Sequence, residues 1–468
     1  MIPMGEALLH LVVEHIPAFG TPLENRRHAA GEPACAPESS LRYQSIMRVL
    51  GITETCDLGS MYLRLLGEGH EVRVSVGNPL ASGTMAGMVP RTADWRAELD
   101  WVREAGDAGL ILFEAVGFGE LQDELRSQGY NVIGGSVFGD KLENDRAAAQ
   151  RLLAKIGLRT APTIEFTDAG DALADLTARP RRCVLKLSAS AGSTVVGVLD
   201  DGRDIAALLR VQPPSGPFVL MDHLTGVETG VGAYFNGHAF LRPACLDWEH
   251  KHFFAGDLGE LTGEMGTVAT FRGSEALFDA TLGPLEDRLR DAGHVGWVNL
   301  NMIVNGDGVW PLEFTCRFGY PGFAVLEPLQ ATGWADLFAS MLRGGTELPT
   351  HDGFSLCVVL STPPFPLARN EVDAPVGLPV VAQDVDTQHL HWGEVGLVDG
   401  QLVTAGLYGW TAVVTGTGLT VESAKVAAYA RAAHVRTPNL RYRLDIGDKL
   451  IDGAFQQLTD WGWMKSMP

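Results

Sequence analysis

The stretch PLEFTCRFGYP, residues 311–321, alternates polar and apolar side chains as a β-strand does. One face of that strand would carry the carboxylate of Glu313, the hydroxyl of Thr315 and the guanidinium of Arg317, with Pro311 on the same side. The other face would be apolar throughout. A glycine and a proline then end the strand. An acid, a hydroxyl and a base in one row predict a strand that faces a polar site.

A second polar strand precedes this one. The segment GWVNLNMIVNGDGVW predicts two strands joined by a turn at residues 305–308. If they share a face, Asn299 and Asn301 lie near Glu313. Carboxylate and amide oxygens suit Mg²⁺, which usually takes one or two protein ligands and completes its shell with phosphates and water. A solvated hairpin face is the alternative interpretation.

Three further segments concentrate charge or small residues. In KLSASAGSTVVGV, Lys186 ends a strand and is followed by a loop whose backbone N–H groups could approach an anion; a tight hairpin with an exposed lysine is the alternative. The segment LDWEHKHF contains His250 and Lys251 and would otherwise be a solvated loop. The Gly-rich segment GDLGELTGEMGTV is either a connector or a substrate lid.

The totals limit the classes of protein. The chain has 468 residues, beyond the roughly 250–300 at which single cores stop growing, so two to four packed units are expected. The net charge of −21 argues against binding nucleic acid through a broad basic surface, although a nucleotide needs only a local cluster of donors. The six cysteines are scattered, which fits a reducing cytosol and predicts a cytoplasmic protein. The apolar runs are too short to predict a membrane span.

The elements that must position these side chains begin at about residue 46. Strands then alternate with helices, which predicts a parallel Rossmann-like sheet. The first turn, GITETCDLGS, lacks G-x-G-x-x-G and gives no support for a dinucleotide site. Helices are predicted for LENDRAAAQRLLAKIG, ALFDATLGPLEDRLRDAGH and VESAKVAAYARAAH. Residues 1–45 are expected to be a loosely attached extension without a signal peptide, and Met47 is an alternative start.

The order of these segments resembles that of the phosphoribosylamine–glycine ligase family of ATP-grasp enzymes. LENDRAAAQRLL resembles the family's helix Leu-Glu-Gly-Ser-Lys-x-x-x-Lys, and LDWEHKHFFAGDLGELTGEMG resembles its Asp-His-Lys-Arg segment and Gly-rich loop. PLEFTCRFGYP resembles its metal-binding strand, and PVGLPV, VTAGLYGWTAVVTGTGLTVESAKVAAYARA and RYRLDIG resemble its C-terminal domain. The likeness covers about residues 46–455.

The resemblance implies an α/β and α+β protein, namely an ATP-grasp fold with an N-terminal Rossmann-like parallel-sheet domain and a C-terminal mostly β domain. The expected divisions are an extension (1–45), the N-terminal domain (46–140), the ATP-grasp domain (141–345, with a flap at about 160–222), the C-terminal domain (351–455) and a tail (456–468).

The resemblance also implies roles for individual residues. The implied nucleotide-binding residues are Arg146, Lys186, Gly192, Asp222, Leu224 and Glu228. The implied metal ligands are Glu313 and Thr315, with Asn299 as a further candidate. The implied catalytic residues are Arg317, Lys251 and His250.

The implied activity is ATP-dependent ligation of a carboxylate to an amine through an acyl phosphate, as in purine biosynthesis. ATP with Mg²⁺ (or Mn²⁺) is the implied cofactor set, since Lys, Arg and Mg²⁺ stabilise charge on the transferred phosphoryl group. The expected partners are small molecules, not nucleic acid or a membrane, and the chain is expected to be a monomer or a homodimer. No enzyme nucleophile is needed.

Several positions depart from the family pattern. Thr315 replaces an Asn, Ser193 a Lys and Glu264 a Gly, and the hinge has Met221–Asp222 for two glutamates. The metal strand ends with Tyr320 and Gly322 where the family has acids. The first turn carries Glu54 and Asp57 where the family binds a substrate phosphate, and these acids would repel one. Three hypotheses therefore stay open: the family's own reaction, a related ligase joining another acid and amine, or a nucleotide-binding protein without catalysis.

Overall fold

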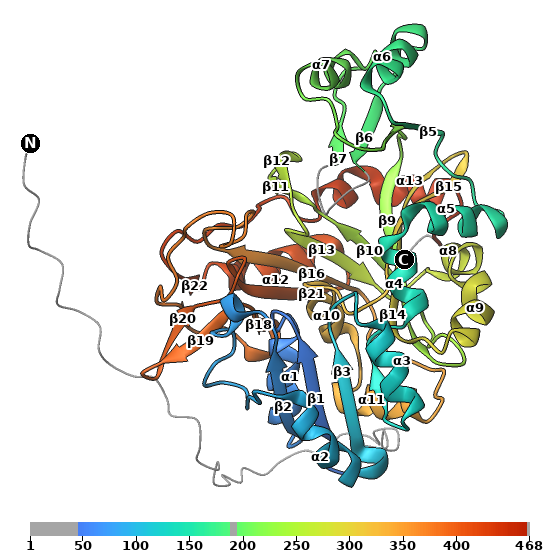
Figure 1. Ribbon diagram of the computed structural model, residues 1–468. Coiled ribbons are helices and arrows are strands. Elements are labelled where there is room, and N and C mark those ends of the chain that lie inside the picture. The colour runs from blue at the N-terminus through green and yellow to red at the C-terminus, as the bar shows by residue number, and fades with distance from the viewer. Residues whose placement is uncertain (1–44, 188–193, 466–468) are drawn as a thin grey trace, which may run out of the picture. The chain divides into compact units, whose positions relative to one another are not determined.

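The N-terminal part of the chain is a four-stranded parallel sheet, as predicted. The computed structural model describes residues 45–187 and 194–465 (Figure 1), so the expected extension up to residue 44 lies outside the described residues, as do Gly192 and Ser193. The strand order is β2-β1-β3-β4, and every neighbouring pair is parallel. The strands are β1 (Arg48–Thr53), β2 (Glu71–Val76), β3 (Gly109–Phe113) and β4 (Val132–Ile133), and the helices between them are α1 (Gly59–Gly67), α2 (Leu99–Glu104) and α3 (Gly119–Ser127).

A smaller antiparallel sheet occupies the segment at about 160–222, for which the sequence predicts a flap. Its strand order is β5-β8-β6-β7, and its apolar side chains form a core of their own. Its elements are β5 (Thr163–Phe166), α6 (Ala169–Ala178), β6 (Cys183–Leu187), β7 (Thr194–Val196), α7 (Arg203–Val211) and β8 (Phe218–Asp222).

The largest element is an eight-stranded antiparallel sheet with the order β15-β14-β9-β10-β13-β16-β21-β18. Its strands are β9 (Val227–Asn236), β10 (Cys245–Glu249), β13 (Gly266–Thr270), β14 (Val295–Asn305), β15 (Gly308–Thr315), β16 (Phe354–Ser361), β18 (Leu390–Trp392) and β21 (Trp410–Gly418). Because β13 pairs with β16, the C-terminal segment continues the sheet of the ATP-grasp segment. A domain boundary between residues 345 and 351 stays a proposal.

Helix α12 (Val421–Ala432) lies along β16 and β21 in Figure 1 and packs its alanines against them. A Cβ at Gly416 of β21 would overlap the backbone of α12, so glycine allows this close approach. The remaining elements are α10 (Gly322–Leu326), α11 (Trp334–Leu342), α13 (Phe455–Asp460) and the strand pairs β11 (His252–Phe254) with β12 (Leu258–Leu261), β17 (Val381–Ala382) with β22 (Val435–Arg436), and β19 (Val395–Val398) with β20 (Gln401–Thr404).

Two of the helices predicted as continuous are interrupted. The first is α4 (Val137–Asn144) followed by α5 (Arg146–Lys155), because the Asp145 side chain accepts a hydrogen bond from the Ala148 N–H and so caps a new helix. The second is α8 (Glu275–Ala280) and α9 (Glu286–Asp291), separated by a 3₁₀ turn at Gly283–Leu285 that contains a proline.

The predicted hairpin, with its turn at residues 305–308, is confirmed as β14 and β15, and Asn305 is paired to Gly308. The predicted alternation holds only in part. The register shifts between Asn301 and Met302, so Pro311 is buried and Leu312 is half-buried. From Glu313 onward the polar and apolar sides alternate as expected.

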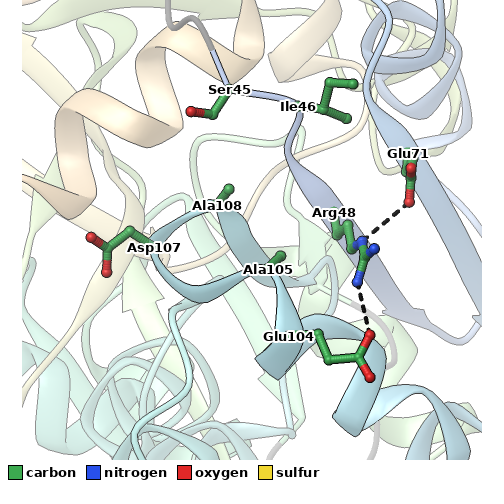
Figure 2. A pocket seen from close by; sticks show the side chains of 8 residues that line it. All are labelled: Ser45, Ile46, Arg48, Glu71, Glu104, Ala105, Asp107 and Ala108. Carbon is green, nitrogen blue, oxygen red and sulfur yellow. Dashed lines mark hydrogen bonds and ion pairs between the residues drawn. The ribbon is translucent and has the colours of Figure 1, made fainter.

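The described residues contain no helix that is long and apolar enough to cross a membrane. A hollow of about 450 Å³ opens at the start of β1, next to α2 (Figure 2). There Arg48 forms ion pairs with Glu71 at 3.2 Å and Glu104 at 3.3 Å. The remaining polar side chains that line this hollow are few, so it is not the site that the sequence predicts.

Candidate active site

A cleft of about 780 Å³ lies over one face of the large sheet. Its floor is a row of side chains in register across four strands, from Asp247 on β10 through Gly230 on β9 and Asn301 on β14 to Glu313 on β15. The opposite face of these strands is apolar and belongs to the main core. Alternation along each strand thus directs the polar side chains into one cleft.

Two glycines on β9 make room for this row. A Cβ at Gly230 would overlap Asp247 Oδ1 and lie 2.8 Å from Asn301 Oδ1. A Cβ at Gly232 would overlap the ring of Trp297 and lie 3.0 Å from Asn299 Nδ2. Side chains from the neighbouring strands therefore meet above the bare backbone of β9.

Lys251 is the cation at the centre of one end of the cleft. Its ammonium lies 3.0 Å from Glu313, 3.2 Å from Glu249 and 3.7 Å from Glu228. Burial alone would lower the pKa of Lys251, but these carboxylates hold it well above its usual range. Arg146 adds a second ion pair to Glu313 at 2.7 Å. The charge of Lys251, with that of Arg146, lowers the pKa of Glu313 to about 2 although burial acts to raise it, so this carboxylate is ionised.

Lys186 belongs to the same charged group. Burial, followed by the charge of Arg146, lowers the pKa of Lys186 to about 8, while the carboxylates of Glu313 and Glu228 oppose this. The structure therefore brings Arg146, Lys186, Lys251, Glu228 and Glu313 together, although they come from α5, β6, β9, β15 and the segment after β10. This group is called the cationic end of the cleft below.

Arg317 also lines the cleft, directly after β15. Its Nε lies 3.1 Å from Glu143 Oε1, and the other oxygen of Glu143 accepts the Cys316 N–H at 2.9 Å. Glu143, near the end of α4, therefore fixes the position of the guanidinium.

The other end of the cleft contains acids that lack such partners. Asp247 and Glu264 are buried, and Asp247 Oδ1 and Glu264 Oε1 have no hydrogen-bond partner among the described residues. The second oxygen of Asp247 accepts the Asn299 amide at 2.5 Å, which leaves Asn299 Oδ1 without a partner. Burial and the charge of Glu249 raise the pKa of Asp247 to about 8. The same two causes raise the pKa of Glu264. The three acids Asp247, Glu264 and Asp57 are called the acidic end below.

Three of the predicted site residues lie elsewhere. His250 is buried behind the sheet, where its Nε2 accepts the Gly447 N–H at 3.2 Å, and burial lowers its pKa to about 4. This geometry does not support the predicted catalytic role of His250, because Glu249 and Lys251 take the cleft side of the chain. Asp222 forms an ion pair with Arg181 of the flap at 2.6 Å, and Leu224 follows it in the loop after β8. Gly192 lies outside the described residues.

The comparisons with known proteins agree with this architecture. A domain profile described as "Phosphoribosylglycinamide synthetase, ATP-grasp (A) domain" matches residues 144–323. A phosphoribosylamine–glycine ligase from a Nostoc species is 30% identical over 347 residues, covering 70% of this chain and 80% of that protein. One from Listeria monocytogenes is 27% identical over 370 residues, covering 75% and 86%.

The chain belongs to the phosphoribosylamine–glycine ligase family. It is an ATP-grasp enzyme, an ATP-dependent ligase that forms a carbon–nitrogen bond. The crystal structure of the phosphoribosylamine–glycine ligase of Thermotoga maritima superposes with a TM-score of 0.66 at 22% identity, covering 86% of this chain and all of that one. A biotin carboxylase domain from Hydrogenobacter thermophilus, described in complex with MgADP, shares the fold at 12% identity and a TM-score of 0.56, covering 88% and 99%.

The first turn of this family member is organised around an internal carboxylate. Glu114, directly after β3, is buried; its Oε2 accepts the Leu58 N–H at 3.0 Å, and its Oε1 accepts the Tyr62 hydroxyl at 2.8 Å. Leu58 is the N-cap residue directly before α1, so a protein carboxylate already takes a donor at this helix N-terminus. Asp57 next to it lines the cleft.

The sequence reasoning missed Asp247, Glu143 and Glu114. A signal for Asp247 was present, because the run DWEHK puts Asp247, Glu249 and Lys251 on one face of a strand and Trp248 and His250 on the other. Nothing local marks Glu114 or Glu143, since each meets its partner across a long stretch of sequence.

Proposed function

We propose that this chain joins a carboxylate to an amine by forming an acyl phosphate from ATP. The first reaction to test is the ligation of glycine to phosphoribosylamine in purine biosynthesis. The observation that carries the proposal is the cationic end, where Arg146, Lys186 and Lys251 converge on Glu313. Three cations around one ionised carboxylate suit a triphosphate and the charge that spreads over its transferred phosphoryl group.

Each residue of the cationic end would have a distinct part. Lys186 and Arg146 would bind the phosphates, and Arg317, held by Glu143, would face the phosphoryl group and the acyl group that receives it. Lys251 would keep Glu313 ionised until substrates arrive. The hinge at Asp222–Leu224 and the acid Glu228 would hold the adenosine part.

The donor set fits the magnesium ion that ATP-grasp ligases use. Glu313 is an ionised carboxylate, Thr315 offers a hydroxyl, and Asn299 has an amide oxygen without a partner. Hard oxygen donors of this kind are the ligands that Mg²⁺ prefers, with phosphate oxygens completing the shell. When bound, the ion would neutralise phosphate charge.

The test is an assay of phosphate release with product detection by mass spectrometry. ATP, Mg²⁺, glycine and freshly generated phosphoribosylamine should release phosphate only when all are present, and glycinamide ribonucleotide should form. The absence of both nucleotide binding and phosphate release with any acid and amine would contradict the proposal.

One observation favours a second candidate, a ligase of this family that joins another acid and amine. Glu114 takes up donors at the N-terminus of α1, and Glu54 and Asp57 add negative charge at the turn where the family binds a substrate phosphate. Tight ADP binding with no turnover of phosphoribosylamine, together with turnover of a different amine, would select this candidate.

A further inference from the structure

The charges that line the cleft do not balance. The cations Arg146, Lys251 and Arg317 line it, and each is already paired with a carboxylate of the protein, while Lys186 lies with the carboxylates of the cationic end. Its acidic end keeps several carboxyl groups that no cation of the described residues contacts. A phosphorylated substrate would bring negative charge next to these carboxyl groups, which have no counter-charge.

Two buried carboxyl oxygens in the acidic end lack a hydrogen-bond donor. Asp247 and Glu264 are 6% and 8% exposed, both line the cleft, and each has one oxygen without a hydrogen-bond partner. Leaving a buried polar atom without a hydrogen-bond partner destabilises the protein. Because Asp247 and Glu264 both stand in the cleft, a ligand that donates hydrogen bonds there would remove this destabilisation.

An aromatic wall stands beside these acids. The rings of Tyr320 and Trp410 stack with centroids 4.8 Å apart at 19°, and Tyr408 lies 4.8 Å from Trp410. All three line the cleft, and the Tyr320 hydroxyl and Trp410 Nε1 are also buried without partners. The charges of Asp57 and Glu264 contribute to raising the pKa of Tyr320 after burial, which places these acids close to the aromatic wall.

Buried carboxyl groups that lack a cationic partner, beside aromatic side chains, suit an organic ammonium group, which binds through charge-assisted hydrogen bonds and cation–π attraction. A metal ion is a poorer match, since no three His, Cys, Asp or Glu side chains among residues 45–187 and 194–465 are grouped to hold one.

We propose that Asp247 and Glu264 of the acidic end, together with Tyr320 and Trp410 of the aromatic wall, bind an ammonium group of an unphosphorylated amine substrate. This inference rests on the second candidate of the proposed function, a ligase of this family that joins another acid and amine, and it names the substrate class of that amine. A compound with two amino groups meets this requirement. One amino group can stay charged at the acidic end, while the other is neutral, attacks the acyl carbon, displaces phosphate and loses a proton.

The experiment measures binding of 1,4-diaminobutane to the full chain by calorimetry, in the presence of saturating MgADP. Binding of the diamine is expected, with much weaker binding of 1,4-butanediol, which has no ammonium group, and of ribose 5-phosphate. The double variant Asp247→Asn/Glu264→Gln should weaken diamine binding at least about tenfold while leaving the affinity for MgADP unchanged. Trp410→Leu should weaken binding of the diamine as well.

A control must separate the site from the general acidity of the chain. The double variant Glu422→Gln/Asp452→Asn removes the same charge from exposed positions on α12 and near the C-terminus, and it should leave diamine binding unchanged. Equal losses in both double variants would overturn the inference, as would ribose 5-phosphate binding in preference to the diamine. Loss of MgADP binding by the unaltered chain would instead contradict the proposed ligase function, so the two failures are distinguishable.

Discussion

The two ends of the cleft treat buried carboxylates in opposite ways. At the cationic end, Glu313 is paired with Lys251 and Arg146, and its pKa is lowered to about 2. At the acidic end, burial raises the pKa of Asp247 to about 8, and one of its oxygens has no partner. Both residues lie in the same row of side chains, three strands apart. The difference indicates that the protein supplies the counter-charges at one end and leaves them to a ligand at the other.

The largest effect is expected from Glu313→Gln, which removes the carboxylate on which the cationic end converges. Turnover in the phosphate-release assay should fall at least about a hundredfold, because both the proposed metal ligand and the partner of Lys251 are lost. The control is Glu260→Gln on β12, an exposed position outside the cleft, which should keep full activity. Unchanged turnover in Glu313→Gln would remove the metal assignment.

Lys251→Met tests whether the pairing of cations with carboxylates at the cationic end stabilises the folded protein. Removing the one ammonium that contacts Glu228, Glu249 and Glu313 leaves a group of like charges, and a loss of about 3 kcal/mol in the free energy of unfolding is expected. Urea denaturation measures it. A change below about 1 kcal/mol would show that the carboxylates do not depend on Lys251.

Lys186→Ala should raise the KM for ATP about tenfold, since a charged hydrogen bond to phosphate is lost. Lys186→Arg keeps the charge, so its KM for ATP should lie between the KM of the unaltered chain and that of Lys186→Ala. If alanine leaves the KM unaltered, Lys186 does not bind phosphate.

The pH dependence of ATP binding should follow Lys186. Its pKa is about 8, lowered by burial and then by Arg146, so the side chain is charged below that pH and loses its charge above it. The KM for ATP should be flat below about pH 7 and rise several-fold between about pH 8 and about pH 9. Lys186→Arg should abolish the rise because a guanidinium stays protonated; a rise that persists in this variant would assign the titration to another group.

The smallest effect on stability is expected from Asp247→Asn. Because no cation among residues 45–187 and 194–465 forms an ion pair with Asp247, the free energy of unfolding should change by less than about 1 kcal/mol, in contrast to Lys251→Met. A loss as large as that of Lys251→Met would show that Asp247 is a structural residue, and the contrast between the two ends would then fail.

The fold was largely predictable because its signals are local. Alternation of strand and helix patterns predicted the parallel sheet, and the turn at residues 305–308 predicted the β14–β15 hairpin. The breaks at Asp145 and Gly283 were missed, since a helix cap competes with a helical pattern only once the surrounding chain is placed.

By itself, the sequence determined the strand that carries Glu313, Thr315 and Arg317, and the order of segments that marks the family. Only the tertiary structure decided which charges have partners. Lys251 meets Glu313, and Glu114 meets Leu58, across 62 and 56 positions of the chain. Such pairings depend on strand register and on bare positions such as Gly230, which alternation alone does not specify. The strand 311–321 thus predicted a polar site, and its neighbours in the sheet decided that one end of that site is cationic and the other acidic.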